Sequence, residues 1–255
     1  MLLNKDISLE GGLRTQHEKQ VRIDLGQMFE NNGDEISTKL ENFPKYVRRQ
    51  NITRFLAQYE LFKQVLNVKG SIVECGVFRG SGLFSWTHFS SILEPNNIMR
   101  KIYGFDTFSG FSQINKMDLG RNTSKEVKVG GLKADSYGEL NKLIKIHDNN
   151  RFLGHVNKTN LIKGDVCKTI PEFIKDNPHL LVSLLYLDLD LYEPTRVAIE
   201  NFLPRMPKGS IIAFDELDNR LWPGETLAVM ETIGLNKLKI ERFDFDPYIG
   251  FARIE

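Results

Sequence analysis

The chain has 255 residues, of which 41% are hydrophobic and 26% are charged, and its formal net charge is +1. These values are ordinary for a globular protein, and the length is enough for one large α/β domain. A nearly neutral chain is not drawn to nucleic acid or to a membrane surface by a long-range field, so we expect neither as a partner.

The first 16 residues lack the apolar core of a signal peptide, and no later segment approaches a membrane span in length and apolarity. The two cysteines, Cys75 and Cys167, cannot make a disulfide framework. We therefore expect a protein of the reducing cytoplasm.

The first 40 residues are polar, with a turn-prone stretch at Asn31–Glu35. Behind them, apolar side chains recur at helical spacing over Asn51–Leu66 and predict a helix. We expect residues 1–68 to be a helical arm or lid and residues 69–255 to be the main domain. The arm could also join two copies of the chain in a homodimer or a larger homo-oligomer.

From residue 71 onward, predicted strands alternate with predicted helices. The alternation predicts a doubly wound, Rossmann-like α/β sheet of seven strands, mostly parallel, with right-handed crossovers. Only Asp246 and Pro247 separate the last two strands, so these two should form an antiparallel hairpin at the end of the sheet. Strands are expected near 71–75, 101–106, 159–164, 183–188, 210–215, 238–244 and 248–254, and helices near 81–93, 136–147, 168–176, 194–203 and 224–233. Three prolines are expected in first helical turns, where proline is tolerated: Pro171, Pro194 and Pro223.

One long segment, Phe108–Asp135, is rich in Gly, Lys, Asn and Ser and shows no period. A loop of this length inside a compact domain is usually a lid, a binding loop or disordered. We expect it, together with the N-terminal arm, to select a ligand.

Two short apolar runs end in acidic residues. The run Leu184–Leu187 is followed by Asp188 and Asp190, and the run ending at Phe214 is followed by Asp215 and Glu216. The carboxyl ends of parallel strands meet at one edge of a sheet, where ligands bind. A cluster of carboxylates there needs a cation. The alternative is that these acids cap helices or face water.

A glycine turn follows the first strand, in the sequence ECGVFRGSG. Its spacing is neither that of the dinucleotide-binding motif nor that of the phosphate-binding P-loop. The next two strands end in Asp106, which could accept both hydroxyls of a ribose, and in Asp165, which could meet an adenine amino group. Together these features favour an adenosyl ligand, although the glycines alone could serve only the tight turn.

The residues from about 72 to 254 resemble a class I S-adenosylmethionine-dependent methyltransferase. More narrowly, they are similar to the macrocin O-methyltransferase (TylF-like) family of sugar O-methyltransferases. The motifs that carry the resemblance are ECGVFRGSG, YGFDTFSGF, KGDV, LYLDLDLYEPT, LPRMPKGSIIAFDE and WPG. On this basis the residues expected to bind S-adenosylmethionine are Glu74, Gly76, Arg79, Gly80, Ser81, Asp106, Ser109, Asp165 and Val166.

The resemblance also implies a divalent metal ion, usually Mg²⁺, bound by Asp188, Asp215 and Glu216. The family more often has two aspartates in the last pair, so Glu216 departs from its pattern. The related catechol O-methyltransferases place a lysine base three residues after the first metal ligand, where this chain has Leu191. Asp190, with Asp188 beside it, is therefore the candidate catalytic base, the alternative being that Asp190 supports the site or caps a helix.

The resemblance implies methyl transfer to a hydroxyl of a sugar or of a glycosylated small molecule. A bound metal would help this reaction by lowering the pKa of the hydroxyl. A rival interpretation is a metal-dependent glycosyltransferase in which Asp188 and Asp190 form a DxD motif. That interpretation leaves the glycine turn and the pair Asp215–Glu216 without a role. Trp222, which follows the second acidic pair, is a candidate lid over the metal.

Overall fold

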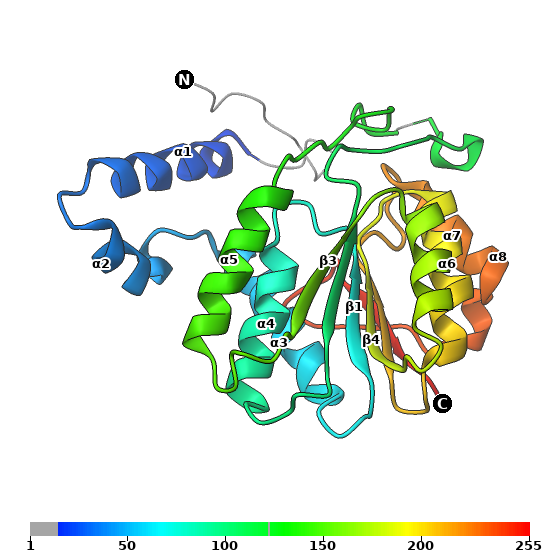
Figure 1. The fold of residues 1–255 in the computed structure, drawn as a ribbon. Coiled ribbons are helices and arrows are strands. Elements are labelled where there is room, and N and C mark those ends of the chain that lie inside the picture. Colours follow the sequence, from blue (N-terminus) through cyan, green and yellow to red (C-terminus); the bar gives the residue numbers. More distant parts are fainter. Residues whose placement is uncertain (1–14, 122) are drawn as a thin grey trace. The chain divides into compact units, whose positions relative to one another are not determined.

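The computed structural model describes residues 15–121 and 123–255 (Figure 1). Residues 1–14 lie outside the described residues. They belong to the expected N-terminal arm and to the N-terminal segment that lacks the apolar core of a signal peptide. The chain divides into two compact units, the first ending at Leu56 and the second running from Ala57 to Glu255. Each unit is described by itself.

The described part of the first unit is helical. It contains α1 (Gln16–Asn31), α2 (Ile36–Glu41), the short 3₁₀ helix η1 (Phe43–Lys45) and the beginning of α3 (Arg49–Gln64). Thr15 starts α1 with a capping box, because its side chain accepts the Glu18 N–H while the Glu18 carboxylate accepts the Thr15 N–H. The helix predicted over 51–66 is present as α3, two residues earlier at each end.

The second unit is built on a seven-stranded sheet in the order β3-β2-β1-β4-β5-β7-β6. The first five strands are parallel, while β7 runs antiparallel to β5 and to β6. The predicted fold class is therefore confirmed, including the antiparallel hairpin at the end of the sheet. The strands are β1 (Ser71–Cys75), β2 (Ile102–Asp106), β3 (Thr159–Lys163), β4 (Val182–Leu187), β5 (Ile211–Phe214), β6 (Glu241–Arg242) and β7 (Gly250–Arg253).

The hairpin differs from the prediction in the length of its connection. Its pairs are Glu241 with Phe251 and Arg242 with Gly250, so the connection is 243–249 rather than two residues. Asp246 explains the longer loop, because its Oδ1 accepts the backbone N–H groups of the second and third residues after it. This local turn competes with the ladder and ends the pairing early.

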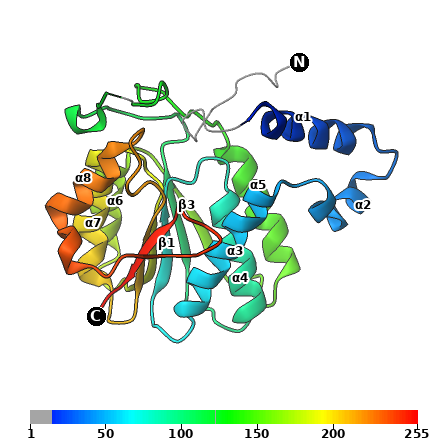
Figure 2. The same cartoon turned by 180° about the vertical axis from the view of Figure 1, so that it is seen from behind.

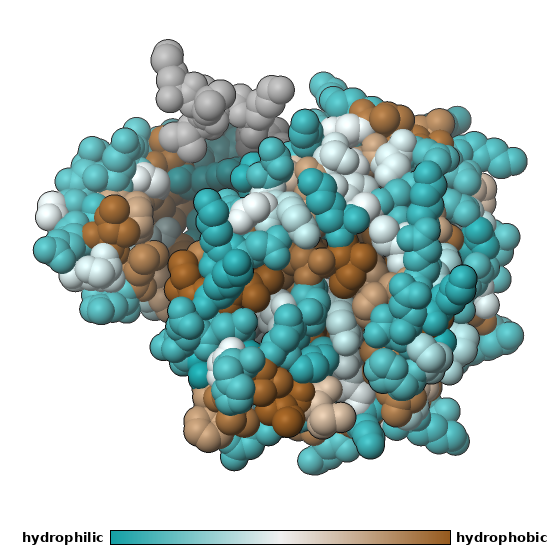
Figure 3. All heavy atoms as spheres, in the orientation of Figure 1, coloured by the Kyte–Doolittle hydropathy of each residue, from teal (hydrophilic) through white to brown (hydrophobic). Residues whose placement is uncertain are grey.

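Helices cover both faces of the sheet (Figures 1 and 2). One face packs against α3 from Ala57 onward, α4 (Ser81–Leu93) and α5 (Tyr137–Asn150), and the other against α6 (Val166–Asp176), α7 (Tyr192–Phe202) and α8 (Pro223–Thr232). Each face has its own apolar core, formed on the first by residues such as Leu61, Trp86 and Tyr186 and on the second by Phe105, Phe202 and Phe214. Figure 3 shows hydrophilic residues over most of the visible surface, as expected when these cores hold the large apolar side chains.

The prediction for Pro171 was wrong. Helix α6 begins at Val166 rather than at 168, because the Asp165 side chain caps it by accepting the Cys167 N–H at 3.0 Å. Pro171 therefore lies inside the helix. By contrast, Pro194 and Pro223 lie in the first turns of α7 and α8, as expected.

Among the described residues, none of the helices combines the length and the apolar character needed to cross a membrane.

Candidate active site

The candidate site lies at the edge of the sheet where β1, β2, β4 and β5 end. The loops after these strands hold five non-glycine residues in the left-handed region, with φ between 49° and 61°: Phe78, Phe108, Leu132, Asp190 and Asp218. Such backbone conformations cost on the order of 1–3 kcal/mol each and persist only where the surrounding structure demands them. All four loops are thus held in conformations that the chain would not adopt alone.

The glycine turn after β1 passes directly against the end of β4. Gly76 has φ +96°, and a Cβ placed on it would lie 1.7 Å from the backbone oxygen of Asp188. Only glycine fits this approach. Gly80, with φ +85°, is the N-cap of α4, so α4 begins directly after the glycine turn.

Glu74 lies beneath this turn rather than on it. Its side chain is 2% exposed and points at the first turn of α4, where a Cβ on Gly82 would come within 2.1 Å of its Oε1. Burial raises the pKa of Glu74 well above its ordinary value, and the nearby charges of Asp188 and Asp106 raise it further. The predicted neighbours Arg79 and Ser81 are exposed, with the Arg79 guanidinium 5.3 Å from the centre of the Phe78 ring.

Asp106 joins two loops at the end of β2. Its Oδ2 accepts the Phe78 N–H at 2.7 Å and its Oδ1 accepts the Phe108 N–H at 2.6 Å. The carboxylate therefore holds the glycine turn and the loop after β2 in fixed positions, with Ser109 exposed beside it. Farther along the edge, Asp165 is half-buried and its Oδ1 caps α6, a role that the sequence did not predict for this acid. Val166, which follows it, is buried.

The predicted acids after β4 and β5 come from adjacent parallel strands. Asp190 is buried, and burial together with the charge of Asp188 raises its pKa well above the ordinary value. Asp215 is also buried and accepts the Tyr186 hydroxyl at 3.1 Å, while Glu216 accepts a hydrogen bond from the Asn219 amide.

Sequence reasoning missed a further acid, Glu225, in the first turn of α8. Its side chain is fully buried, and its Oε1 accepts the backbone N–H of Glu216 at 2.8 Å. Burial raises its pKa, and the charges of Glu216, Asp190 and Asp188 add to this effect, so the four carboxyls share one electrostatic environment. The signal available in the sequence was an acid directly after the WPG motif.

The acidic region offers carboxylate oxygens, the type of donor that a hard divalent cation prefers. Crowded carboxylates repel one another, and a cation with oxygen ligands such as Mg²⁺ would relieve that repulsion. Glu225 Oε2 is buried and has no hydrogen-bond partner among the described residues, and this adds to the cost of ionising the carboxyl. However, in the described parts of the chain no three His, Cys, Asp or Glu side chains are grouped closely enough to hold a metal ion.

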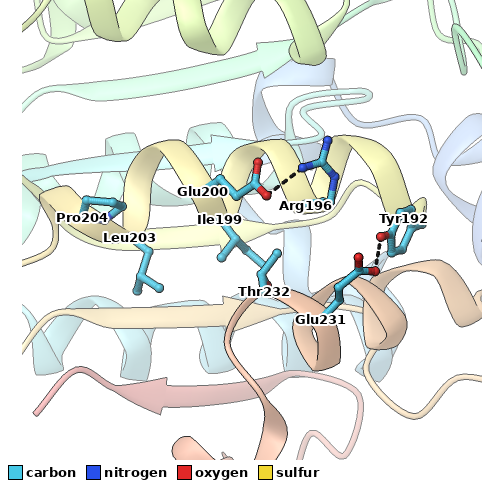
Figure 4. Close-up of a pocket in the computed structure, with 8 residues that line it drawn as sticks. All are labelled: Tyr192, Arg196, Ile199, Glu200, Leu203, Pro204, Glu231 and Thr232. Carbon is cyan, nitrogen blue, oxygen red and sulfur yellow. Dashed lines mark hydrogen bonds and ion pairs between the residues drawn. The ribbon is translucent and has the colours of Figure 1, made fainter.

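A separate groove lies on the outer side of α7 and α8, with a volume of about 410 Å³ (Figure 4). Its polar side chains bond to one another: Arg196 to Glu200 at 2.7 Å, and the Tyr192 hydroxyl to Glu231. None of the predicted site residues lines this groove.

The doubly wound sheet, the glycine turn after β1, the acid after β2 and the acids after β4 and β5 together define a class I S-adenosylmethionine-dependent methyltransferase. The comparisons with known proteins make the assignment narrower. The chain belongs to the macrocin O-methyltransferase (TylF) family, whose model matches residues 48–246. The predicted resemblance is thereby confirmed.

Two solved structures of one enzyme are similar over nearly the whole chain. CalS11, described as a calicheamicin methyltransferase, is 34% identical, with 94% of this chain and 93% of that chain covered and a TM-score of 0.89. Its apo structure, described as a TDP-rhamnose 3'-O-methyltransferase of calicheamicin biosynthesis, is 34% identical, with 94% and 95% covered and a TM-score of 0.81.

A curated relative from Streptomyces olivaceus is 25% identical over 163 residues. It is named 8-demethyl-8-(2,3-dimethoxy-alpha-L-rhamnosyl)-tetracenomycin-C 4'-O-methyltransferase, and the match covers 58% of this chain and 53% of the relative. The chain thus spans about half the length of this curated protein. The family and these relatives lend no support to the glycosyltransferase interpretation.

Proposed function

We propose that the protein transfers the methyl group of S-adenosylmethionine to a hydroxyl of a sugar or of a glycosylated small molecule, with a divalent cation bound. The observation that carries this proposal is the contact between the glycine turn and the acidic strand end, where Gly76 lies against the Asp188 backbone. A methyl donor on the turn and a hydroxyl near the acids would be neighbours there. Two of the relatives are named as methyltransferases of rhamnose-containing compounds, and these names support a sugar acceptor.

We infer that the donor lies along the glycine turn and the ends of β2 and β3. The Ser81 N–H at the start of α4 would bind its amino-acid part, and Asp106 would accept its ribose hydroxyls. Gly76 and Gly80 would let the donor approach the turn closely, since their own N–H groups donate to the Phe105 and Val77 oxygens. Asp106 still has acceptor capacity for this, because a carboxylate offers about four lone-pair sites and two are used. The remaining predicted donor contacts are Glu74, Arg79, Ser109, Asp165 and Val166.

For the cation, we propose Mg²⁺ bound by Asp188, Asp215 and Glu216. When bound, it would lower the pKa of an acceptor hydroxyl and fix its direction. Asp190 would accept the hydroxyl proton as the oxygen attacks the methyl carbon. When bound, S-adenosylmethionine would supply the methyl group, and its sulfur would keep the electron pair of the methyl–sulfur bond as the new carbon–oxygen bond forms. The buried position of Asp190 supports this role, because a raised pKa makes its carboxylate a better base.

The same proposal includes a small-molecule acceptor rather than nucleic acid or membrane, which the net charge of +1 supports. It also includes a cytoplasmic location and assembly into a homodimer or larger homo-oligomer through the N-terminal arm.

The test is a mass-spectrometric screen of nucleotide-linked sugars and glycosides with S-adenosylmethionine and Mg²⁺. We expect one acceptor class to gain a methyl group, a chelator to abolish the gain, and Mg²⁺ to restore it better than Ca²⁺. Asp190→Asn should lower turnover by ~10²–10⁴-fold while metal affinity persists. Undiminished turnover in chelator would contradict the role of the cation. Calorimetry that detects no binding of S-adenosylmethionine or S-adenosylhomocysteine would contradict the whole proposal.

A further inference from the structure

Asp118 is a buried acid in the long loop between β2 and α5. It ends the short 3₁₀ helix η2 (Lys116–Asp118), and its side chain is 2% exposed. Its Oδ2 accepts the Asn115 N–H at 2.7 Å, and its Oδ1 accepts the Tyr192 N–H at 2.6 Å, across 74 positions of the chain. Burying a carboxylate is costly unless it is well bonded, so these bonds decide where the loop sits.

The bond to Tyr192 supplies a cap that α7 lacks. The N-cap residue of α7 is Leu191, whose side chain has no oxygen to offer. Asp118 therefore takes the place of a capping side chain, in the position at a helix N-terminus that favours negative charge. The long loop thus completes the first turn of a helix that belongs to another part of the site.

The capped turn follows directly on Asp190. Asp190 has φ +61°, and the Leu191 N–H bonds back to the Leu189 oxygen at 2.7 Å, which makes a tight turn centred on the proposed base. Only one residue separates Asp190 from Tyr192. The hydrogen bond from the Tyr192 N–H to Asp118 therefore constrains the backbone directly after this turn. That turn orients the Asp190 carboxyl.

The WPG motif (Trp222–Gly224) packs against the same loop, next to this turn. Trp222 is buried, with its ring centre 5.9 Å from that of Phe111, and the Leu221 oxygen accepts the Ser124 N–H at 3.1 Å. A Cβ on Gly224 would lie 2.2 Å from Asp118 Oδ1 and 2.5 Å from the Tyr192 nitrogen. The absence of a side chain at Gly224 thus leaves room for the hydrogen bond between Asp118 in the loop and Tyr192 in α7. In Figure 1 the loop runs above α7.

We propose that Asp118 is a positioning residue, which caps α7 from the long loop and thereby holds Asp190 in place. Docking of the loop against α7 and orientation of the Asp190 carboxyl are therefore coupled, so that neither occurs without the other. The proposal rests on the proposed function in that it takes Asp190 as the base. It gives the loop a role beyond covering the site.

The test compares Asp118→Ala, Asp118→Asn and Gly224→Ala with wild type, all saturated with S-adenosylhomocysteine. Gly138→Ala is the matched control, because nothing lies within 4 Å of a Cβ on this exposed glycine in α5. Hydrogen exchange is measured in peptides covering 111–121 and 186–194. Both should exchange faster together, by about tenfold, in Asp118→Ala and Gly224→Ala, the effect expected for losing one bond to a charged group. Asp118→Asn, which keeps an acceptor for Tyr192, should restore much of the protection.

In turnover assays, kcat should fall by about tenfold in Asp118→Ala while donor affinity is unchanged, and Asp118→Asn should recover part of it. Faster exchange in the loop alone, or a change confined to KM, would overturn the proposal. If Asp118→Ala does not fold, Asp118→Asn and Gly224→Ala decide the same question. The hydrogen-exchange data also separate this proposal from the proposed methyl transfer. They report the coupling between the loop and the start of α7 even if no acceptor is methylated.

Discussion

The two halves of the strand-end edge carry acids at equivalent places in very different surroundings. After β2 and β3, Asp106 and Asp165 accept hydrogen bonds from backbone N–H groups of the glycine turn and of α6. After β4, Asp190 is buried beside Asp188, and burial and that charge raise its pKa. Glu225 in α8 is also buried near Asp188, Asp190 and Glu216, and its pKa is raised although its Oε1 accepts the Glu216 N–H. The topology places an acid at a strand end, but the neighbouring groups decide what the acid can do.

This difference has a chemical consequence. A carboxylate held by N–H groups is a rigid acceptor whose remaining lone pairs suit the hydroxyls of a neutral ligand. Carboxyls that crowd one another must take up a proton or a cation to lower their repulsion. This contrast is why we propose the first half of the edge for the nucleoside, and the second half for the cation and the reacting hydroxyl.

The largest expected effect comes from removing one charge on the crowded side. Asp188→Asn keeps the shape of the side chain, so the Gly76 contact with its backbone should persist. Turnover should fall by about 10²–10³-fold, since a bound cation contributes several kcal/mol to the reaction. Calorimetry should find the affinity for S-adenosylhomocysteine nearly unchanged. If donor affinity fell as much as turnover, the two halves would not be chemically distinct.

A smaller effect is expected on the other side, from Asp106→Asn. The amide keeps only one acceptor oxygen, so one loop N–H and one ribose hydroxyl lose their partner. Affinity for S-adenosylhomocysteine should fall by about 10–100-fold, the size of one bond to a charged group. Turnover at saturating donor should change little. Asp244→Asn serves as the control, because Asp244 is fully exposed in the hairpin connection. If Asp106→Asn and Asp244→Asn lost equal affinity for S-adenosylhomocysteine, the loss in Asp106→Asn would not come from the donor site.

The smallest effect concerns stability and pH. Because burial and Asp188 raise the pKa of Asp190, the folded protein holds this proton more tightly than the unfolded chain does. The resulting stability is complete below the ordinary pKa of aspartate and is lost as pH rises through the raised pKa. Asn cannot ionise and, like Asp, tolerates the left-handed backbone. In chelator, Asp190→Asn should therefore be more stable than wild type near neutral pH, by about 1 kcal/mol.

Thermal unfolding between about pH 4 and pH 8 measures this effect. The stability of wild type should decline relative to the variant as pH rises. A difference that does not depend on pH would show that Asp190 acts on stability through packing rather than through its charge.

Much of the sheet follows from local patterns. The apolar runs predicted all seven strands, and those of β1 to β5 were placed within about a residue, because a buried parallel strand must be apolar on both faces. The hairpin was predicted from the shortness of its connection, and only its loop length was wrong. The glycine turn could also be recognised, since Gly76 and Gly80 need backbone conformations that other residues avoid.

The contacts of Asp118 and Glu225 could not be predicted in this way. One is an acid in a loop without a period, and the other is an acid in a first helical turn, which usually serves the helix dipole. Their partners are backbone N–H groups 74 and 9 positions away. No local pattern records such a bond, because it depends on how separate loops meet.

By itself, the sequence determined the alternation of strands and helices, the glycine turn and the four acids that follow β4 and β5, because these depend on residue type and short-range spacing. Only the tertiary structure decided which acids are bound by N–H groups and which are crowded together, and that the long loop caps α7 through Asp118. The physical reason is that hydrogen bonding and charge act through space, between groups that the fold brings together from distant parts of the chain.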